Sequence, residues 1–273
     1  MLNFAIDLAR RAGELVLEYQ RRGFAEADIR TKLNHVDLLT EADLASDRYI
    51  TEALRAQYGD HGIYSEESAV GALPDDEWLW IVDPVDGTTN FAHGLPLFGV
   101  NIGLIHRGEP ILGVTCDPTG RRVYWAERGG GAWVREDGQD RRLCVSATSE
   151  LRRCLLCTGF PPSRLATPDN NLAEFGALEL QVHGVRRLGS ACIDLAWVAA
   201  GLLDGYWEPR LKPWDWLPGY LLVTEAGGRV TDYEDRPWQL TSQSMIASNG
   251  VPEVHAAFVA AIAQARVGAG MTG

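Results

Sequence analysis

The strongest constraint on the fold is a change of pattern near residue 146. Between residues 78 and 136 the chain carries short apolar runs separated by polar residues and glycines, namely WLWIVD, FGVNIGLI, ILGVTC, RVYWAE and GAWVRE. Runs of this length and spacing indicate the strands of a largely antiparallel sheet. After residue 146, strand-like runs alternate with helical patterns, which indicates an α/β layer. We therefore predict an α+β protein with two different sheets.

Helical patterns complete this outline. An apolar stripe from Phe4 to Tyr19 predicts a first helix that stops at Gly23, and a second helix is predicted from about Thr40 to Tyr58. The second half should alternate strands CLLCTGF, GVRRL, GYWE and SMIASN with helices near residues 169–182, 190–201, 214–226 and 252–266. We expect one subdomain over residues 1–145 and a second over residues 146–273.

Charge and composition narrow the function. The net charge is −12 and only two of the 25 basic residues are lysines, which argues against a nucleic-acid partner. No apolar run approaches the roughly 18 residues of a membrane span. The opening MLNFAIDLARRAGE is charged and the five cysteines are an odd, sparse set, so we expect a cytoplasmic protein without a membrane partner. A small anionic substrate would be repelled unless metal ions intervened.

The most informative motif is WIVDPVDGTTNF at residues 80–91. An apolar strand ends there in Asp83 and Asp86, followed at once by Gly87 and Thr88. Paired carboxylates can share hard divalent ions, and the backbone N–H groups after them suit a phosphate. Taken alone, DPVDG is more simply a polar turn after a strand.

Three further acidic clusters change that balance. KLNHVDLLTEAD contains Lys32, Asp37, Thr40 and Asp43, IYSEES contains Glu66 and Glu67, and WEPRLKPWDWLPG contains Glu208 and Asp215. Each also has a simpler explanation: Thr40 is a good helix N-cap with acids in the first turn, the two glutamates suit a solvated loop, and Asp215 suits a helix start.

Together, these motifs resemble the inositol monophosphatases within the lithium-sensitive, Mg²⁺-dependent phosphatase superfamily. The resemblance covers nearly the whole chain and rests on the ordered series VDLLTEAD, EES, WIVDPVDGTTNF, GSACIDLAWVAAGLLDGYWE and PWDWLPGYLLVTEAGG. It implies a layered αβαβα sandwich of the sugar-phosphatase type, a homodimer, two or three Mg²⁺ per site and hydrolysis of a small phosphorylated sugar alcohol such as inositol monophosphate.

The resemblance also implies roles for individual residues. The implied metal ligands are Glu66, Asp83, the backbone carbonyl of Val85, Asp86 and Asp215, with Asp83 bridging two ions. Thr88, paired with Asp43 and helped by Glu66, would orient the attacking water. The implied substrate contacts are Asp86, Gly87, Thr88, Gly189, Ser190, Ala191 and Glu208. A metal pair suits this chemistry, because it activates water and neutralises charge on the phosphoryl oxygens.

Departures from the family pattern concern the shape of the site. Ser65 stands where the family usually has Gly, and Trp216 with Pro218 follow Asp215 where smaller residues are common. We expect these changes to affect substrate preference. His93 is interpreted as a polar loop residue, and Arg186 with Arg187 as a solvated strand end rather than a second-phosphate site.

Several rival functions share the metal motifs. They are a 3′(2′),5′-bisphosphate nucleotidase, a fructose-1,6-bisphosphatase and a histidinol phosphatase. Glu208 and the GSA turn at residues 189–191 favour inositol phosphate. The aspartyl-phosphate phosphatases need a DxD pattern, which DPVD does not match. A non-catalytic metal-binding regulatory protein would be expected to have lost a ligand or Thr88, and none of these residues is missing.

Overall fold

The seven-stranded sheet is built from the apolar runs of the first half. The computed structural model describes residues 1–23, 29–32 and 38–271, so Asp37 lies outside the described residues. The strand order is β3-β4-β5-β6-β7-β8-β9, with β3 parallel to β4 and every later pair antiparallel. The strands are β3 (Gly62–Ser65), β4 (Trp78–Asp86), β5 (Gly99–His106), β6 (Glu109–Asp117), β7 (Arg122–Glu127), β8 (Gly131–Glu136) and β9 (Gln139–Arg142).

A second sheet of five strands has the order β11-β10-β12-β14-β13 and mixes parallel and antiparallel pairs. Its strands are β10 (Leu155–Thr158), β11 (Gly184–Arg186), β12 (Gly205–Pro209), β13 (Arg229–Thr231) and β14 (Ser244–Ser248). The short strands β1 (Ile29–Thr31) and β2 (Leu38–Thr40) form a separate antiparallel pair. The change from an antiparallel to an α/β pattern is therefore confirmed.

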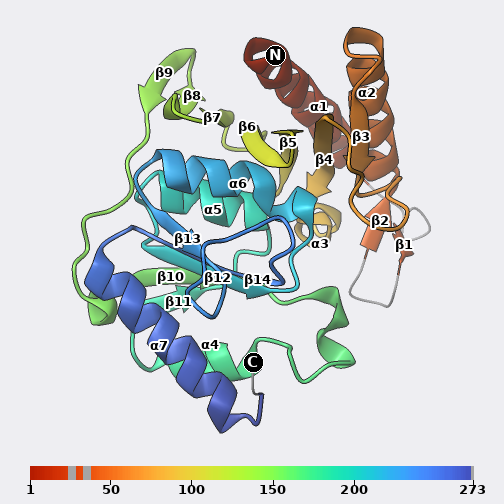
Figure 1. Ribbon diagram of the computed structural model, residues 1–273. Coiled ribbons are helices and arrows are strands. Elements are labelled where there is room, and N and C mark those ends of the chain that lie inside the picture. Colours follow the sequence, from red (N-terminus) through yellow and green to blue (C-terminus); the bar gives the residue numbers. More distant parts are fainter. Residues whose placement is uncertain (24–28, 33–37, 272–273) are drawn as a thin grey trace.

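Helices separate and cover the two sheets in an αβαβα arrangement (Figure 1). Helices α1 (Leu2–Arg22) and α2 (Glu41–Gln57) cover the outer face of the large sheet, and α5 (Ala191–Ala199) with α6 (Pro213–Glu225) fill the space between the sheets. Helices α4 (Leu172–Glu179) and α7 (Pro252–Gly268) cover the small sheet, and α3 (Thr88–Ala92) follows β4 directly. This is the layered sandwich that the family resemblance implies.

The central helices are apolar because both of their faces are covered. Leu195, Trp216, Leu217 and Leu222 are buried and belong to one core cluster that reaches strands of both sheets. Gly103 and Gly113 on the large sheet admit this packing, since an added Cβ would lie 2.2 Å from Leu217 and 2.5 Å from Pro218 respectively. Helix α6 can therefore approach the sheet closely.

The three-residue strands β1, β2 and β13 were not predicted, and two larger elements also differ from the sequence-based expectation. Strand β9 was not predicted, because all four of its residues are exposed and polar and carry no apolar pattern. Helix α4 is shorter than the predicted 169–182. Asn171, with φ 70°, ends the preceding loop in a left-handed conformation, and its buried side chain binds Thr158 and Trp207 instead of continuing a helix.

Among the described residues, no helix is both long and apolar enough to cross a lipid bilayer.

Candidate active site

The two carboxylates of β4 lie at an irregularity in the strand. The register between β4 and β5 shifts between Asp83 and Asp86, so the chain bulges where the acids are placed. Asp83 is buried, and its Oδ1 accepts the backbone N–H of Val85 at 3.1 Å. The bulge thus turns Asp83 and Asp86 toward the same region instead of opposite faces of the sheet.

Gly87 and Gly189 bring the two halves of the chain together beside these acids. Gly87 has φ 91°, and a Cβ there would lie 3.1 Å from the carbonyl oxygen of Gly189. Asn90, on α3, fixes the contact by donating to the carbonyls of Leu97 and Leu188, each at 2.7 Å. A side chain at Gly87 would be strained and would push these backbones apart.

The start of α2 serves both as a helix cap and as part of the site. One oxygen of Asp43 accepts the backbone N–H of Thr40 at 2.8 Å, which is the capping role expected from the sequence. Its other oxygen accepts the Thr88 hydroxyl at 3.1 Å, and that hydroxyl also lies 3.0 Å from the Val85 carbonyl. Burial raises the pKa of Asp43 to about 6, whereas the hydrogen bonds from Thr40 lower it.

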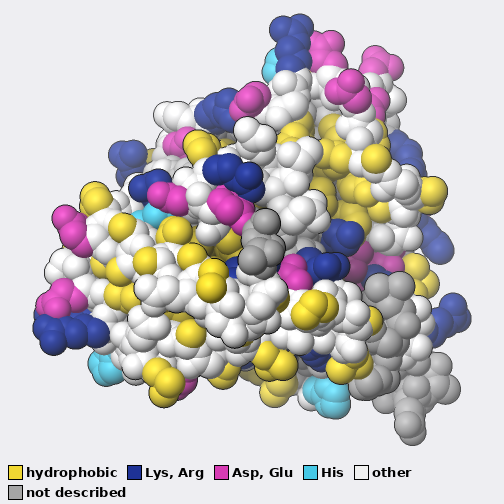
Figure 2. All heavy atoms as spheres, turned by 60° about the horizontal axis from the view of Figure 1, so that its bottom comes forward, with side chains coloured by type: hydrophobic (Ala, Val, Ile, Leu, Met, Phe, Trp, Pro, Cys, Tyr) yellow, Lys and Arg dark blue, Asp and Glu magenta, His cyan; other side chains and the backbone are white. Residues whose placement is uncertain are grey.

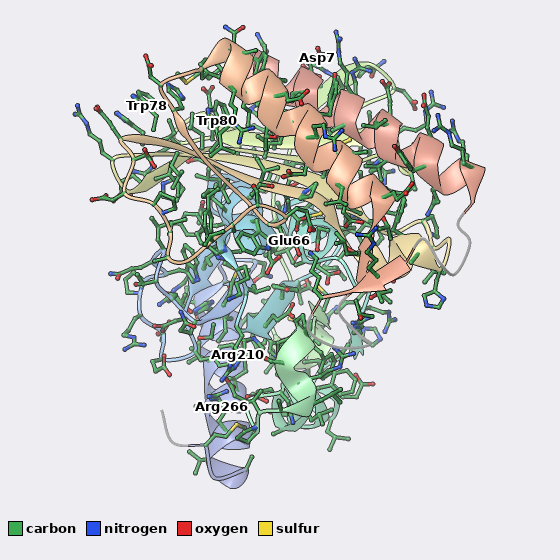
Figure 3. All side chains as sticks on the ribbon, turned by 90° about the vertical axis from the view of Figure 1, so that its right-hand side faces the viewer. Asp7, Glu66, Trp78, Trp80, Arg210 and Arg266 are labelled. Atoms are coloured by element: carbon green, nitrogen blue, oxygen red, sulfur yellow. The ribbon has the colours of Figure 1, made fainter. Side chains whose placement is uncertain are left out.

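Glu66 lies at the edge of this acidic group, between the two halves of the molecule (Figure 3). Its Oε1 is 2.8 Å from Lys32 Nζ, and the same ammonium group is 2.6 Å from Glu67. Burial lowers the pKa of Lys32, but the two glutamates more than offset this and raise it overall. Lys32 therefore stays charged and holds both carboxylates at the rim.

Asp215 completes a cluster that no local spacing could reveal. It lies at the start of α6, where its Oδ2 accepts the Lys212 backbone N–H at 2.8 Å. Oxygens of Asp83, Asp86 and Asp215 all lie within 4.8 Å of one another. Desolvation, followed by the neighbouring acidic charges, raises the pKa of Asp83 and of Asp215 well above the ordinary value. Three carboxylates at such distances suit a hard divalent cation.

The start of α5 holds the last member of this cluster in place. Oδ2 of Asp86 accepts both the Ser190 hydroxyl and the Cys192 backbone N–H, each at 2.7 Å. Burial raises the pKa of Asp86, and the bonds from Cys192 and Ser190 lower it. Asp86 thereby ties the large sheet to the helix layer between the sheets.

Glu208 lies on β12, in the second sheet. It is buried, accepts a hydrogen bond from the Tyr206 hydroxyl, and packs against Gly159, where a Cβ would lie 2.0 Å from its Oε2. Burial raises the pKa of Glu208 to about 7, although the Tyr206 bond lowers it.

One cavity of about 180 Å³ is lined by every predicted site residue except Asp43. Asp43 lies behind it and reaches it through Thr88. The cavity also contains residues that the sequence did not single out: Leu38, Gly159, Phe160, Pro162, Arg164, Asp194 and Leu211. Gly159 lies within the predicted strand run CLLCTGF, directly after the last residue of β10, and that glycine was the available signal.

Three expectations about this region need correction. Arg187, interpreted as a solvated strand end, is exposed but lines the cavity. Trp216 and Pro218 do not line it. Trp216 packs against Trp238 in the core, with ring centroids 3.7 Å apart, and Pro218 packs against Gly113. Ser65 is buried and donates to Asp47, so it supports the strand rather than shaping the cavity.

Comparison with known proteins decides the family. The model of the inositol monophosphatase family matches residues 1–267. The chain belongs to the inositol monophosphatase family. It is 42% identical over 214 residues to an inositol-1-monophosphatase of Synechocystis sp., a match covering 78% of this chain and 73% of the relative.

Other relatives carry a different name or a solved structure. A Nus factor SuhB of Pseudomonas aeruginosa is 40% identical over 255 residues, covering 91% of each chain. The solved inositol monophosphatase of Anabaena (Nostoc) sp. superposes with a TM-score of 0.83 at 39% identity, covering 96% of this chain and 95% of that one. For this member of the inositol monophosphatase family, phosphatase activity is supported, and the acidic cluster agrees with the metal dependence of the family.

Proposed function

We propose that the chain is an Mg²⁺-dependent phosphomonoesterase that hydrolyses inositol monophosphate to inositol and phosphate. The observation that carries the proposal is the cluster of Asp83, Asp86 and Asp215, which brings carboxylates from β4 and α6 together in the lining of one cavity. Like charges this close together, one of them buried and two half-buried, repel one another unless cations or protons intervene. A site made of several carboxylate oxygens favours a hard ion such as Mg²⁺ over softer metals.

The residues of the chain divide into three roles. Glu66, Asp83, Asp86, Asp215 and the carbonyl of Val85 would hold two or three Mg²⁺. When bound, these ions lower the pKa of water and neutralise charge that develops on the phosphoryl oxygens. The backbone N–H groups of Gly87 and Thr88 open α3 and would bind phosphate oxygens.

Thr88 would act on the attacking water. Thr88 donates its hydroxyl to Asp43 at 3.1 Å, so a lone pair of the Thr88 oxygen can accept a hydrogen bond from the water and orient it. Glu66, held by Lys32, would also orient the water.

Glu208, Gly189, Ser190 and Ala191 would contact the alcohol part of the substrate. They line the same cavity as the acidic cluster and lie on the second sheet and the start of α5. A buried carboxyl group beside the phosphate site suits a hydroxyl-rich alcohol, since each hydroxyl both donates and accepts. We also expect a homodimer and inhibition by lithium, as the family resemblance implies.

The test is phosphate release across four substrates: inositol 1-phosphate, fructose 1,6-bisphosphate, adenosine 3′,5′-bisphosphate and histidinol phosphate. We expect the highest kcat/KM for inositol 1-phosphate, full loss of activity with EDTA, and recovery with Mg²⁺. Asp215→Asn should nearly abolish turnover without unfolding the chain. Metal-independent turnover would contradict the mechanism, and a lead for another substrate would overturn the substrate alone.

A second candidate function follows from the relatives that are named Nus factor SuhB. Such a role would use a surface of the molecule and would not need hydrolysis. On the face drawn in Figure 2, Lys and Arg side chains are dispersed among Asp and Glu. The two functions can be separated in Pseudomonas aeruginosa cells in which this chain replaces the relative. Wild type and Asp83→Asn are compared for how well each restores the function of the missing relative. If the inactive variant substitutes as well as wild type, the role is independent of the phosphatase site; if neither substitutes, this candidate is wrong.

A further inference from the structure

We propose that Asp194 is a specificity residue that hydrogen-bonds a hydroxyl group of the substrate's alcohol part, beside Glu208. The inference rests on the proposed phosphatase function and deepens it, because it specifies an uncharged, hydroxyl-rich alcohol as the group that fills the inner end of the cavity.

The position of Asp194 follows from the geometry of α5. Ser190 is the N-cap of this helix, and Ala191 and Asp194 are three residues apart, so the two side chains lie on the same helix face. All three residues line the candidate site, together with Glu208 of β12. Asp194 therefore faces the same space as the groups already assigned to substrate contact.

The carboxyl group of Asp194 is buried without a protein partner. The residue is 1% exposed, and its Oδ1 has no hydrogen-bond partner among the described residues. Leaving a buried polar atom unpaired costs about 1–3 kcal/mol, more if it is charged. Such a group is uncommon in folded proteins and calls for an unseen partner. A substrate hydroxyl in the cavity would supply one.

The surroundings favour a neutral partner over a second anion. Burial and then the charges of Asp86 and Glu208 raise the pKa of Asp194 well above its ordinary value, whereas Arg187 lowers it. Burial raises the pKa of the Cys157 thiol well above its ordinary value, and the charges of Asp194 and Glu208 raise it further. Two carboxyl groups that share a site repel an anion but can bind neighbouring hydroxyls as donor and acceptor.

Arg164 and Arg187 support a rival arrangement, in which the cavity binds a second anionic group. Both line the cavity, and no ion pair with an acidic side chain is found for either one in the described part of the chain. They would bind a second phosphate or a carboxylate at the rim. Because Asp194 and Glu208 are buried and the arginines are more exposed, we assign the inner end of the cavity to hydroxyl groups.

The experiment compares two substrates that share a six-membered ring. Inositol 1-phosphate carries hydroxyl groups on the ring, and cyclohexyl phosphate carries none. Asp194→Leu keeps the branched shape and removes both oxygens, whereas Asp194→Asn keeps hydrogen-bonding atoms. We measure kcat and KM for both substrates with saturating Mg²⁺.

Asp194→Leu should raise KM for inositol 1-phosphate by roughly 10- to 100-fold and leave kcat/KM for cyclohexyl phosphate within about threefold of wild type. Asp194→Asn should retain most of the affinity. Equal losses on both substrates, or none on either, would overturn the assignment. A gain of inositol 1-phosphate affinity in Asp194→Leu would do so as well.

Two controls separate this result from other causes. Glu174→Gln changes another buried acid, whose Oε2 also has no hydrogen-bond partner among the described residues. Glu174 does not line the site, so this variant should change the thermal stability of the protein and leave both substrates' kinetics unchanged. If Asp194→Leu does not fold, Asp194→Ala is judged by the same ratio between the substrates. Failure of the proposed phosphatase function would show differently, as absence of Mg²⁺-dependent turnover of both substrates by the wild-type chain.

Discussion

At the scale of single residues, the chemistry depends on hydroxyl and carboxyl groups that have two tasks each. Asp43 caps α2 and orients Thr88, and Asp215 caps α6 and joins the acidic cluster. The structural and functional explanations of these residues are therefore compatible. A capping bond fixes the side chain, and a fixed side chain is what a catalytic site requires.

Thr88 provides the most direct test of this dual use. Thr88→Val keeps the shape but removes the hydroxyl that lies 3.1 Å from Asp43 and 3.0 Å from the Val85 carbonyl. We expect kcat to fall by about 10²- to 10⁴-fold, the usual contribution of a positioned proton acceptor. Thr88→Ser should keep most of the activity. The measurement is kcat at saturating Mg²⁺ and substrate, and a Thr88→Val enzyme within about threefold of wild type would exclude the assigned role.

Gly159 tests the placement of Glu208. In Gly159→Ala the new Cβ would lie 2.0 Å from Glu208 Oε2, so the carboxyl group must move. We expect KM for inositol 1-phosphate to rise about tenfold with little change in kcat, because substrate binding rather than turnover loses a contact. Gly176→Ala is the matched control: it lies in α4, nothing lies within 4 Å of the new Cβ, and it should stabilise the chain by about 0.5–1 kcal/mol. An unchanged KM in Gly159→Ala would contradict the proposal that Glu208 contacts the substrate.

At the scale of elements, α7 is joined to the small sheet through a buried histidine. His255 Nδ1 lies 2.8 Å from the Ser248 hydroxyl on β14, and Nε2 lies 3.1 Å from the Thr231 hydroxyl on β13. Burial, then the charge of Arg229, lowers the pKa of His255, against the effect of Asp235. The imidazole therefore stays neutral to a lower pH than an exposed histidine does, and it holds the two strands against the helix.

This arrangement predicts a pH-dependent stability. The unfolded state binds a proton at His255 below a pKa of about 6.5, while the folded state binds it only at lower pH. The stabilising effect of His255 should thus be complete above about pH 6.5 and decline as the pH falls. Urea unfolding of wild type and His255→Gln at about pH 7.5 and about pH 5 measures it, and the stability difference should narrow at the lower pH. A constant or widening difference would contradict a lowered pKa.

At the scale of the whole molecule, the candidate site joins elements that only the complete fold brings together. Asp83 and Asp86 belong to the large sheet, Asp215 begins a helix of the central layer, and Glu208 belongs to the small sheet. Figure 1 shows how α5 and α6 separate the two sheets, so any ligand in this cavity connects successive layers. The division into subdomains at residues 1–145 and 146–273 remains a prediction, because α6 packs on both sheets.

Metal binding should therefore stabilise the entire molecule. Mg²⁺ at 100 times its Kd should add about 2.7 kcal/mol to the free energy of unfolding. Asp83→Asn removes one carboxylate from the cluster, so it should lose most of this Mg²⁺-dependent gain while unfolding no earlier than wild type in EDTA. Thermal unfolding with and without Mg²⁺ checks both parts. An equal Mg²⁺ shift in the variant would contradict the ligand assignment.

The sequence by itself determined what depends on short-range pattern. The apolar runs predicted β4 to β8, the glycines and caps located most helix ends, and DPVDG identified the acidic end of β4. The polar strand β9 was not predicted, because an edge strand needs no apolar face. The later start of α4 was not predicted either, because Asn171 is held by partners that are distant in sequence. Family resemblance, rather than spacing, connected Asp215 and Glu208 with the motif.

Only the tertiary structure decided which residues surround the cavity. Asp194 comes from an apolar helix, where local sequence indicates packing alone, and Gly159 comes directly after a buried strand. Trp216 and Pro218 follow Asp215 in sequence yet lie in the core, since helix geometry turns successive side chains in different directions. Sequence neighbours share a backbone, but a site is made by side chains that converge from separate layers, and that convergence depends on how the helices and sheets pack.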